Sequence, residues 1–190
     1  MPQNKNNFSK NAKLKFKGEI FEVWQWQQKM FDGSAETFEK LKRPNTAQVI
    51  PVIGNKILIQ KQKQPNKLKS FTSISGGRCE LNEKPLNSAK RELLEETGYA
   101  SKNWRLLSKQ NPVNKILWTV YTYIAKDCFY KQPQELDAGE KIEIKFVSFD
   151  KFLMLSEDKT FHESGLKSDL LRARFDKKFR KEFYRLLFEK

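Results

Sequence analysis

The first half of the chain alternates apolar and polar positions in the way that β-strands do. Residues 20–27, IFEVWQWQ, are rich in β-forming side chains, an Asp-Gly pair then offers a turn, and alternation resumes over ETFEKL. This pattern predicts an antiparallel hairpin over residues 19–41, with Trp24 and Trp26 on one face. Such a stripe is more typical of a core or an interface, although adenine stacking by one of the two tryptophans stays open.

A second hairpin is predicted where residues 46–53, TAQVIPVI, and residues 56–62, KILIQKQ, flank a Gly-Asn pair. Three more β-type runs follow a central helix. The run at residues 116–125, ILWTVYTYIA, is apolar enough to lie in the middle of a sheet. The order of elements predicts an α+β fold without repeats.

The C-terminal helical region, residues 165–190, holds Phe179, Phe183 and Leu187 at helical spacing with Arg and Lys between them. This spacing predicts an amphipathic closing helix whose basic face is solvated. Residues 1–16 hold few apolar groups and are expected to form a flexible basic tail before a single domain over residues 17–190.

Composition narrows the class of protein. The 190 residues suit one domain, and the net charge of +14 fits either attraction to polyanions or simply solvated lysines. The start lacks the apolar core of a signal peptide, and no apolar run approaches the roughly 18 residues of a membrane span, so a cytoplasmic protein without membrane partners is expected. Cys79 and Cys128 form no CxxC pair, which argues against zinc and for reduced thiols.

Residues 76–100, GGRCELNEKPLNSAKRELLEETGYA, combine a glycine pair with a helix predicted over Pro85–Thr97. At 3.6 residues per turn, Glu92, Glu95 and Glu96 fall within an arc of roughly 100°. Like charges at this spacing repel, so a cation among them is favoured; the alternative is a surface helix with scattered acids.

Oxygen ligands without thiolate or imidazole favour Mg²⁺, with Mn²⁺ as a substitute. Glu96 is the first expected ligand and Glu92 the second. Arg91 stands four residues before Glu95 and is expected to pair with it, which would leave Glu92 and Glu96 freer for the metal. Side-chain-free backbone at Gly76 and Gly77 can approach a metal or a phosphate, and the carbonyl of Gly76 is a further candidate ligand.

These residues match the signature of the Nudix hydrolases, which is Gly, five residues, Glu, seven residues, then Arg-Glu-apolar-x-Glu-Glu-x-Gly-apolar. The matching positions are Gly77, Glu83, Arg91, Glu92, Leu93, Glu95, Glu96, Gly98 and Tyr99, where only Tyr99 departs from the usual aliphatic residue. The resemblance implies an α/β/α sandwich around a mixed sheet and hydrolysis of a nucleoside diphosphate linked to another group. For Glu83 a structural role at the helix dipole and a catalytic role both stay open.

Beyond the signature, residues 18–155 resemble the ADP-ribose pyrophosphatase branch. In that branch an N-terminal hairpin helps build a homodimer with a composite substrate site, so the resemblance makes Trp24 and Trp26 candidate substrate contacts. Pro112 follows the signature at about the place of a proline in that branch and is a further candidate substrate contact. The loop LDAGE resembles the acidic loop of the branch. Glu140 is therefore a candidate metal ligand or general base, against the alternative of a solvated loop acid.

The chain also departs from that branch. Ser75 stands where the branch usually has a small residue or proline, and Asn82 where glycine is frequent. Residues 60–63, QKQK, stand where the branch carries an aromatic-plus-arginine pattern. Within that stretch, Lys63 is a candidate substrate contact. His162 is the only histidine and is interpreted as incidental, and no P-loop or GxGxxG motif occurs.

The expected activity is Mg²⁺-dependent hydrolysis of ADP-ribose or a related nucleoside diphosphate sugar to a nucleoside monophosphate and a sugar phosphate. The expected catalytic residues are Glu140, Glu95 and Arg91. Two alternatives stay open. One is a Nudix enzyme acting on another nucleotide or on RNA 5′ ends, which the net charge of +14 and the basic residues at 172–185 suggest, although nucleic acid is not the favoured partner. The other is a non-catalytic nucleotide-sensing module, although such modules should lack one of the metal acids.

Overall fold

A computed structural model describes residues 8–189. The thirteen strands and four helices of this part of the chain are β1 Lys13–Lys17, β2 Glu22–Lys29, β3 Ala35–Lys42, β4 Thr46–Ile53, β5 Lys56–Lys63, β6 Phe71–Ser73, β7 Ser75–Arg78, α1 Pro85–Thr97, β8 Tyr99–Ala100, β9 Asn103–Gln110, β10 Ile116–Leu117, β11 Val120–Lys126, β12 Phe129–Tyr130, β13 Lys141–Val147, α2 Phe149–Met154, α3 Ser164–Phe175 and α4 Lys177–Phe188.

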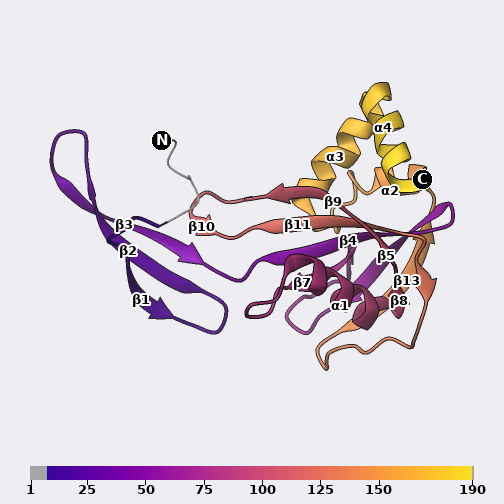
Figure 1. Ribbon diagram of the computed structural model, residues 1–190, viewed down its shortest axis with the longest axis horizontal. Coiled ribbons are helices and arrows are strands. Elements are labelled where there is room, and N and C mark those ends of the chain that lie inside the picture. The colour runs from indigo at the N-terminus through magenta and orange to yellow at the C-terminus, as the bar shows by residue number, and fades with distance from the viewer. Residues whose placement is uncertain (1–7, 190) are drawn as a thin grey trace.

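The N-terminal sheet has the strand order β1-β2-β3-β10 and extends away from the rest of the molecule (Figure 1). The predicted hairpin is confirmed, since β2 and β3 pair antiparallel from Glu22↔Lys42 to Lys29↔Ala35. The expectation of a flexible tail up to residue 16 is wrong at its end, because β1 pairs with β2 over Lys13–Lys17. Alternating Leu14 and Phe16 supply the missed strand signal, and residues 1–7 lie outside the described part of the chain.

The second and larger sheet has the order β13-β5-β4-β11-β9, with β6 paired to β5 and β7 paired to β4. β4 and β11 run parallel, and β11 lies between β4 and β9, as the apolar run predicts. The run at residues 116–125 is split into β10 and β11, which belong to different sheets. The break falls at Trp118 and Thr119, where the Thr119 N–H donates to Asn45 Oδ1 over 3.0 Å instead of to a strand partner.

Helices cover both faces of the larger sheet, with α1 on one side and α2, α3 and α4 on the other (Figure 1). Ala47 and Val49 of β4 pack with Leu93 of α1, whereas Ile50 of the same strand packs with Phe183 of the closing helix. Because β4 is covered on both faces, its residues are buried without alternation. The α/β/α sandwich and the amphipathic closing helix α4 are thus confirmed.

No helix among residues 8–189 combines the length and the apolar character that crossing a membrane requires.

Candidate active site

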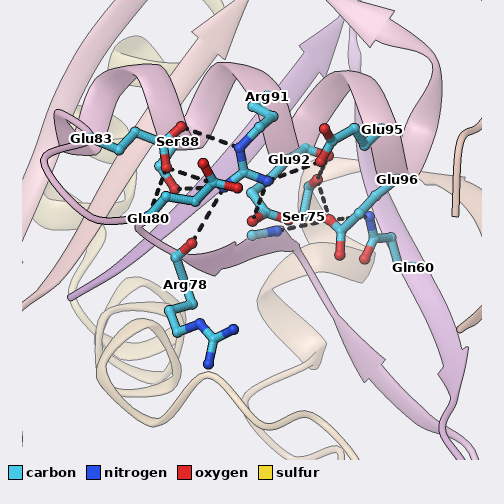
Figure 2. Close-up of polar contacts among 11 residues, drawn as sticks. Gln60, Ser75, Arg78, Glu80, Glu83, Ser88, Arg91, Glu92, Glu95 and Glu96 are labelled. Carbon is cyan, nitrogen blue, oxygen red and sulfur yellow. Dashed lines mark hydrogen bonds and ion pairs between the residues drawn. The ribbon is translucent and has the colours of Figure 1, made fainter. Parts of the chain in front are cut away.

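The signature helix α1 begins and ends where the sequence predicts. Pro85 occupies the first turn, and Gly98 ends the helix in the left-handed conformation at φ 74° while its N–H donates to Leu94 O over 2.8 Å. Ala89 and Leu93 are fully buried against the sheet. This packing fixes the rotation of α1, so its acidic face turns toward β7 (Figure 2).

Arg91 forms ion pairs with three of the signature acids. Its Nη1 lies 2.9 Å from both Glu95 Oε2 and Glu92 Oε1, and its Nε and Nη2 each lie 3.2 Å from an oxygen of Glu83. These carboxylates, Glu83 foremost, raise the pKa of Arg91 above its ordinary value. The predicted Arg91–Glu95 pair is confirmed. The expectation that this pair frees Glu92 is wrong, because one guanidinium nitrogen bridges both acids.

Glu83 closes the loop before α1. It accepts from the Glu80 N–H over 2.9 Å as well as from Arg91, and the hydrogen bonds from Arg91 lower its pKa. These contacts give Glu83 a structural role, because it ties the loop to the helix and orients Arg91, while its catalytic role stays open.

Glu96 is the most deeply buried acid of the signature, with 4% of its surface exposed. Its Oε2 accepts from Ser75 Oγ at 2.5 Å, from the Gly76 N–H at 2.9 Å and from Gln60 Nε2 at 3.0 Å (Figure 2). Burial raises the pKa of Glu96 to about 8 against the opposing effect of these three donors. The carboxyl therefore joins α1 to β7 and β5, and it favours its neutral form in the absence of a cation.

Ser75 and Gln60, which the sequence interpretation treated only as departures from the branch, hydrogen-bond the Glu96 carboxyl. The signal was a buried polar pattern: Gln60 and Gln62 alternate with Lys61 and Lys63 on β5, and both glutamines are buried. A buried amide requires a hydrogen-bond partner, and Glu96 provides one for Gln60.

The two glycines of β7 leave room for different neighbours: Gly77 for the Glu92 carboxylate and Gly76 for the backbone of β4. A Cβ at Gly77 would lie 2.3 Å from Glu92 Oε1, and a Cβ at Gly76 would lie 2.5 Å from the Ala47 carbonyl, with φ at 154°. Burial raises the pKa of Glu92 to about 6 against the opposing effect of Arg91. Glycine at position 77 therefore lets the Glu92 carboxylate sit directly against the backbone of β7, and a Cβ there would displace that carboxylate.

The donor set fits a hard divalent cation. Glu92, Glu95 and Glu96 offer only oxygen, and the backbone of Gly76 lies beside Glu96. Within residues 8–189, no three Asp, Glu, His or Cys side chains converge as they stand into a set that could hold a metal ion. The acids are instead engaged with protein donors, Arg91 at Glu92 and Glu95, and Ser75 at Glu96. Binding a metal there requires these side chains to exchange their protein donors for the ion.

Glu140 lies within electrostatic range of this cluster. Burial first, then the charges of Asp137 and Glu95, raise its pKa, and Glu140 in turn acts on Glu92. The Glu140 N–H donates to Asp137 O over 2.9 Å, which forms a turn just before β13. The structure thus brings the loop carboxylate predicted from the sequence near the signature acids, although no direct contact joins them.

The remaining predicted substrate contacts lie elsewhere. Within one chain, Trp24 and Trp26 belong to the N-terminal sheet, where Trp24 stacks on Phe8 at 4.8 Å and Trp26 packs on Phe38 at 6.2 Å. Lys63 is exposed at the end of β5, opposite Lys141. None of these three side chains contacts the α1 acids.

Pro112 lines a pocket of about 310 Å³ on the face of the sheet opposite α1. The polar and aromatic walls of this pocket are Thr46, Gln48, Gln110, Trp118, His162 and Glu163. Burial raises the pKa of Glu163 to about 7. His162, interpreted from the sequence as incidental, is part of the wall and packs edge-on against Phe71 at 4.9 Å.

Comparison with known proteins agrees with this geometry. The NUDIX domain model matches residues 42–168. The chain is 26% identical over 152 residues to an ADP-ribose pyrophosphatase of Bacillus subtilis (strain 168), and 26% identical over 155 residues to the methanol dehydrogenase activator of Bacillus methanolicus. Each alignment covers 78% of this chain and 82% of the relative.

Among solved structures, a crystal structure of an ADP compounds hydrolase superposes with a TM-score of 0.71 at 19% identity, over 87% of this chain and 90% of that one. This likeness shows a shared fold. The family match spans most of the chain and includes the glycine pair and the acids of α1. The chain therefore belongs to the NUDIX domain family, and the complete acidic signature on α1 is that of the hydrolases of this family.

Proposed function

We propose that this protein hydrolyses the phosphoanhydride bond of a nucleoside diphosphate linked to a sugar, with ADP-ribose as the best candidate, in the presence of Mg²⁺. The observation that carries the proposal is the set of signature acids, Glu92, Glu95 and Glu96, gathered on one face of α1 against the glycine pair of β7. A relative at 26% identity is named an ADP-ribose pyrophosphatase, and the solved neighbour is named an ADP compounds hydrolase, which supports this substrate class.

In the proposed reaction a water oxygen forms a bond to phosphorus, the bridging P–O bond breaks, and the water proton passes to a base. Mg²⁺ held by Glu92, Glu95, Glu96 and the Gly76 carbonyl would neutralise the diphosphate oxygens. Arg91 holds Glu95 and Glu92 in place, and Gln60 and Ser75 hold Glu96. Glu140 is the proposed proton acceptor, because the raised pKa of a loop carboxylate near the cluster suits a general base.

The decisive experiment presents ADP-ribose, other sugar nucleotides, NADH, dinucleoside polyphosphates and capped RNA to the protein with Mg²⁺, with Mn²⁺ and with a chelator. The proposal expects a nucleoside monophosphate and a sugar phosphate from ADP-ribose, and only when a divalent cation is present. A matched pair of variants completes the design: Glu96→Gln should lose turnover, whereas Glu182→Gln, at an exposed position on α4, should keep it. Metal-independent turnover, or turnover of none of these compounds, would overturn the proposal.

We also propose that the protein forms a homodimer through the N-terminal sheet. Leu14 and Phe16 alternate on β1 and are 44% and 60% exposed, so they form an apolar stripe on one face of this edge strand that a second copy of the chain would cover. Light scattering of the purified chain tests the dimer directly, and a mass equal to one chain of 22.5 kDa would contradict it.

A further inference from the structure

Two arginine side chains on the face of the sheet opposite α1 have no acidic partner. Arg78 stands opposite Thr46 in the antiparallel pair of β7 and β4, and Arg43 lies three residues before Thr46 in the chain. Cross-strand neighbours place their Cβ atoms about 5 Å apart, so Arg78 and Thr46 share one face. Across residues 8–189, neither guanidinium forms an ion pair with a carboxylate.

Aromatic side chains hold the Arg43 guanidinium in place, but one of its hydrogen-bond donors has no acceptor among the described residues. Its guanidinium lies 4.6 Å from the centroid of the Trp118 ring and 5.8 Å from that of Phe21, and the Trp118 indole N–H donates to Thr46 Oγ1 over 3.0 Å. The Nε atom of Arg43 is buried and lacks a hydrogen-bond partner, which holds for no other side-chain nitrogen or oxygen of the described residues. An orphaned buried donor costs about 1–3 kcal/mol, so its retention calls for a reason.

The electrostatics of the pair favour an anion. Burial and the positive charge of Arg78 lower the pKa of Arg43 from its ordinary value. Two guanidinium groups close enough to repel each other are relieved by a ligand with several acceptor oxygens. The planar donor fork of arginine fits phosphate oxygens, and stacking on an aromatic ring pre-orders that fork.

The position of the pair connects it to the signature acids. Arg78 lies on the same short strand as Gly76 and Gly77, which contact Glu96 and Glu92, and its side chain turns away from those acids (Figure 2). Trp118, which lies under Arg43, also lines the pocket of about 310 Å³ on this face. A ligand held by the two arginines thus has an adjoining pocket on one side and the glycine pair on the other.

We propose that Arg43 and Arg78 form a subsite for a phosphate group of the nucleotide substrate, with Trp118 fixing Arg43 and the adjoining pocket receiving the organic part attached to that phosphate. The subsite deepens the proposed function, on which it rests. It explains why Arg43 keeps an unpartnered donor and why two arginines gather on this face of the sheet without an acidic partner in the described part of the chain.

The test is equilibrium binding of AMP to the full-length, metal-free chain in the presence of a chelator, with adenosine as the probe that lacks the phosphate. The wild-type chain should bind AMP more tightly than adenosine, and AMP binding should weaken with rising salt. Arg78→Gln and Arg43→Gln should each weaken AMP binding at least about tenfold, which corresponds to about 1.4 kcal/mol, and leave adenosine binding unchanged. Arg105→Gln, at an exposed position on β9, is the matched control and should change neither.

Arg78 is exposed, so its variant keeps the fold and decides the question even if Arg43→Gln destabilises the chain. Arg78→Lys should recover part of the AMP affinity, since the charge returns without the fork. Equal AMP affinity in Arg78→Gln and wild type, or equal affinity of the wild type for AMP and adenosine, would overturn the subsite. Arginine-dependent AMP binding in a protein that hydrolyses no diphosphate would overturn the proposed function and keep the subsite.

Discussion

Replacing Glu96 by Gln should stabilise the metal-free protein at neutral pH while abolishing its turnover. Burial raises the pKa of Glu96 from its ordinary 4.5 to about 8, so the folded chain holds a proton that the unfolded chain releases. Stability is therefore lost as the pH rises from 4.5 toward 8. Each pH unit in that window costs about 1.4 kcal/mol, which amounts to about 3 kcal/mol by pH 7.

Glu96→Gln has no group to ionise at this position, so its folding stability does not fall in this way as the pH rises. A glutamine carbonyl can accept from Ser75, Gly76 and Gln60 in place of Oε2, so the three donors keep an acceptor. Groups outside the acidic cluster titrate alike in both proteins. The difference between the two pH dependences therefore reports on Glu96 together with Glu92, the charge that acts on it, and should reach about 3 kcal/mol between pH 4.5 and pH 7.

The assay is urea unfolding, followed by circular dichroism, at pH 5, 6 and 7 in the presence of a chelator. Glu182→Gln serves as the control, and its stability is expected to depend on pH in the same way as that of the wild type. Turnover of ADP-ribose with Mg²⁺ should fall at least about 100-fold in Glu96→Gln, because charge neutralisation by a bound metal is worth several kcal/mol. Parallel pH dependences for Glu96→Gln and wild type would refute the argument from burial, and unchanged turnover would refute the assignment of Glu96 as a metal ligand.

Three further predictions concern other parts of the site and the core. Glu140→Gln should lower kcat by a factor of about 10² or more with little change in KM, measured by steady-state kinetics; unchanged kcat would place the base elsewhere. Gly77→Ala places a Cβ 2.3 Å from Glu92 Oε1 and should displace this flexible carboxyl, which reduces turnover at least about tenfold while Tm changes little. Full activity of the variant would show that the position of Glu92 against β7 is not needed for turnover. Phe183→Ala should destabilise the fold by about 3–5 kcal/mol in urea unfolding, since its side chain is 1% exposed. A loss under 1 kcal/mol would show that α4 packs less tightly than the structure indicates.

The signature helix could be predicted from the sequence because its signals are local. Pro85, Gly98 and the spacing of the acids lie within one segment, and they fixed both ends of α1 and its acidic face. The closing helix and the central place of β11 follow from periodicity and apolar content in the same way.

The partners of the acids could not be predicted in this way, because they come from other elements. Gln60 on β5 and Ser75 on β7 reach Glu96 across 36 and 21 positions of the chain. Arg91 also forms an ion pair with Glu92, the next residue in the chain. Helical spacing alone would not predict this pair, because the side chains of adjacent residues on a helix point in different directions. The path of the chain between two sheets at Trp118 likewise depends on contacts with Asn45 and Thr46, distant in sequence.

The acidic face of α1, the burial of Glu96 and the unpartnered donor of Arg43 each break a rule that favours folding. Three acids on one helix face repel, Glu96 buries a carboxylate, and Arg43 buries a donor without a partner. Elsewhere the chain follows the rules, with an apolar core on both faces of the sheet and glycine where a helix ends. A cation would offset the first two costs and phosphate oxygens would offset the third, so the proposed metal-bound nucleotide diphosphate is a single ligand that would account for all three departures.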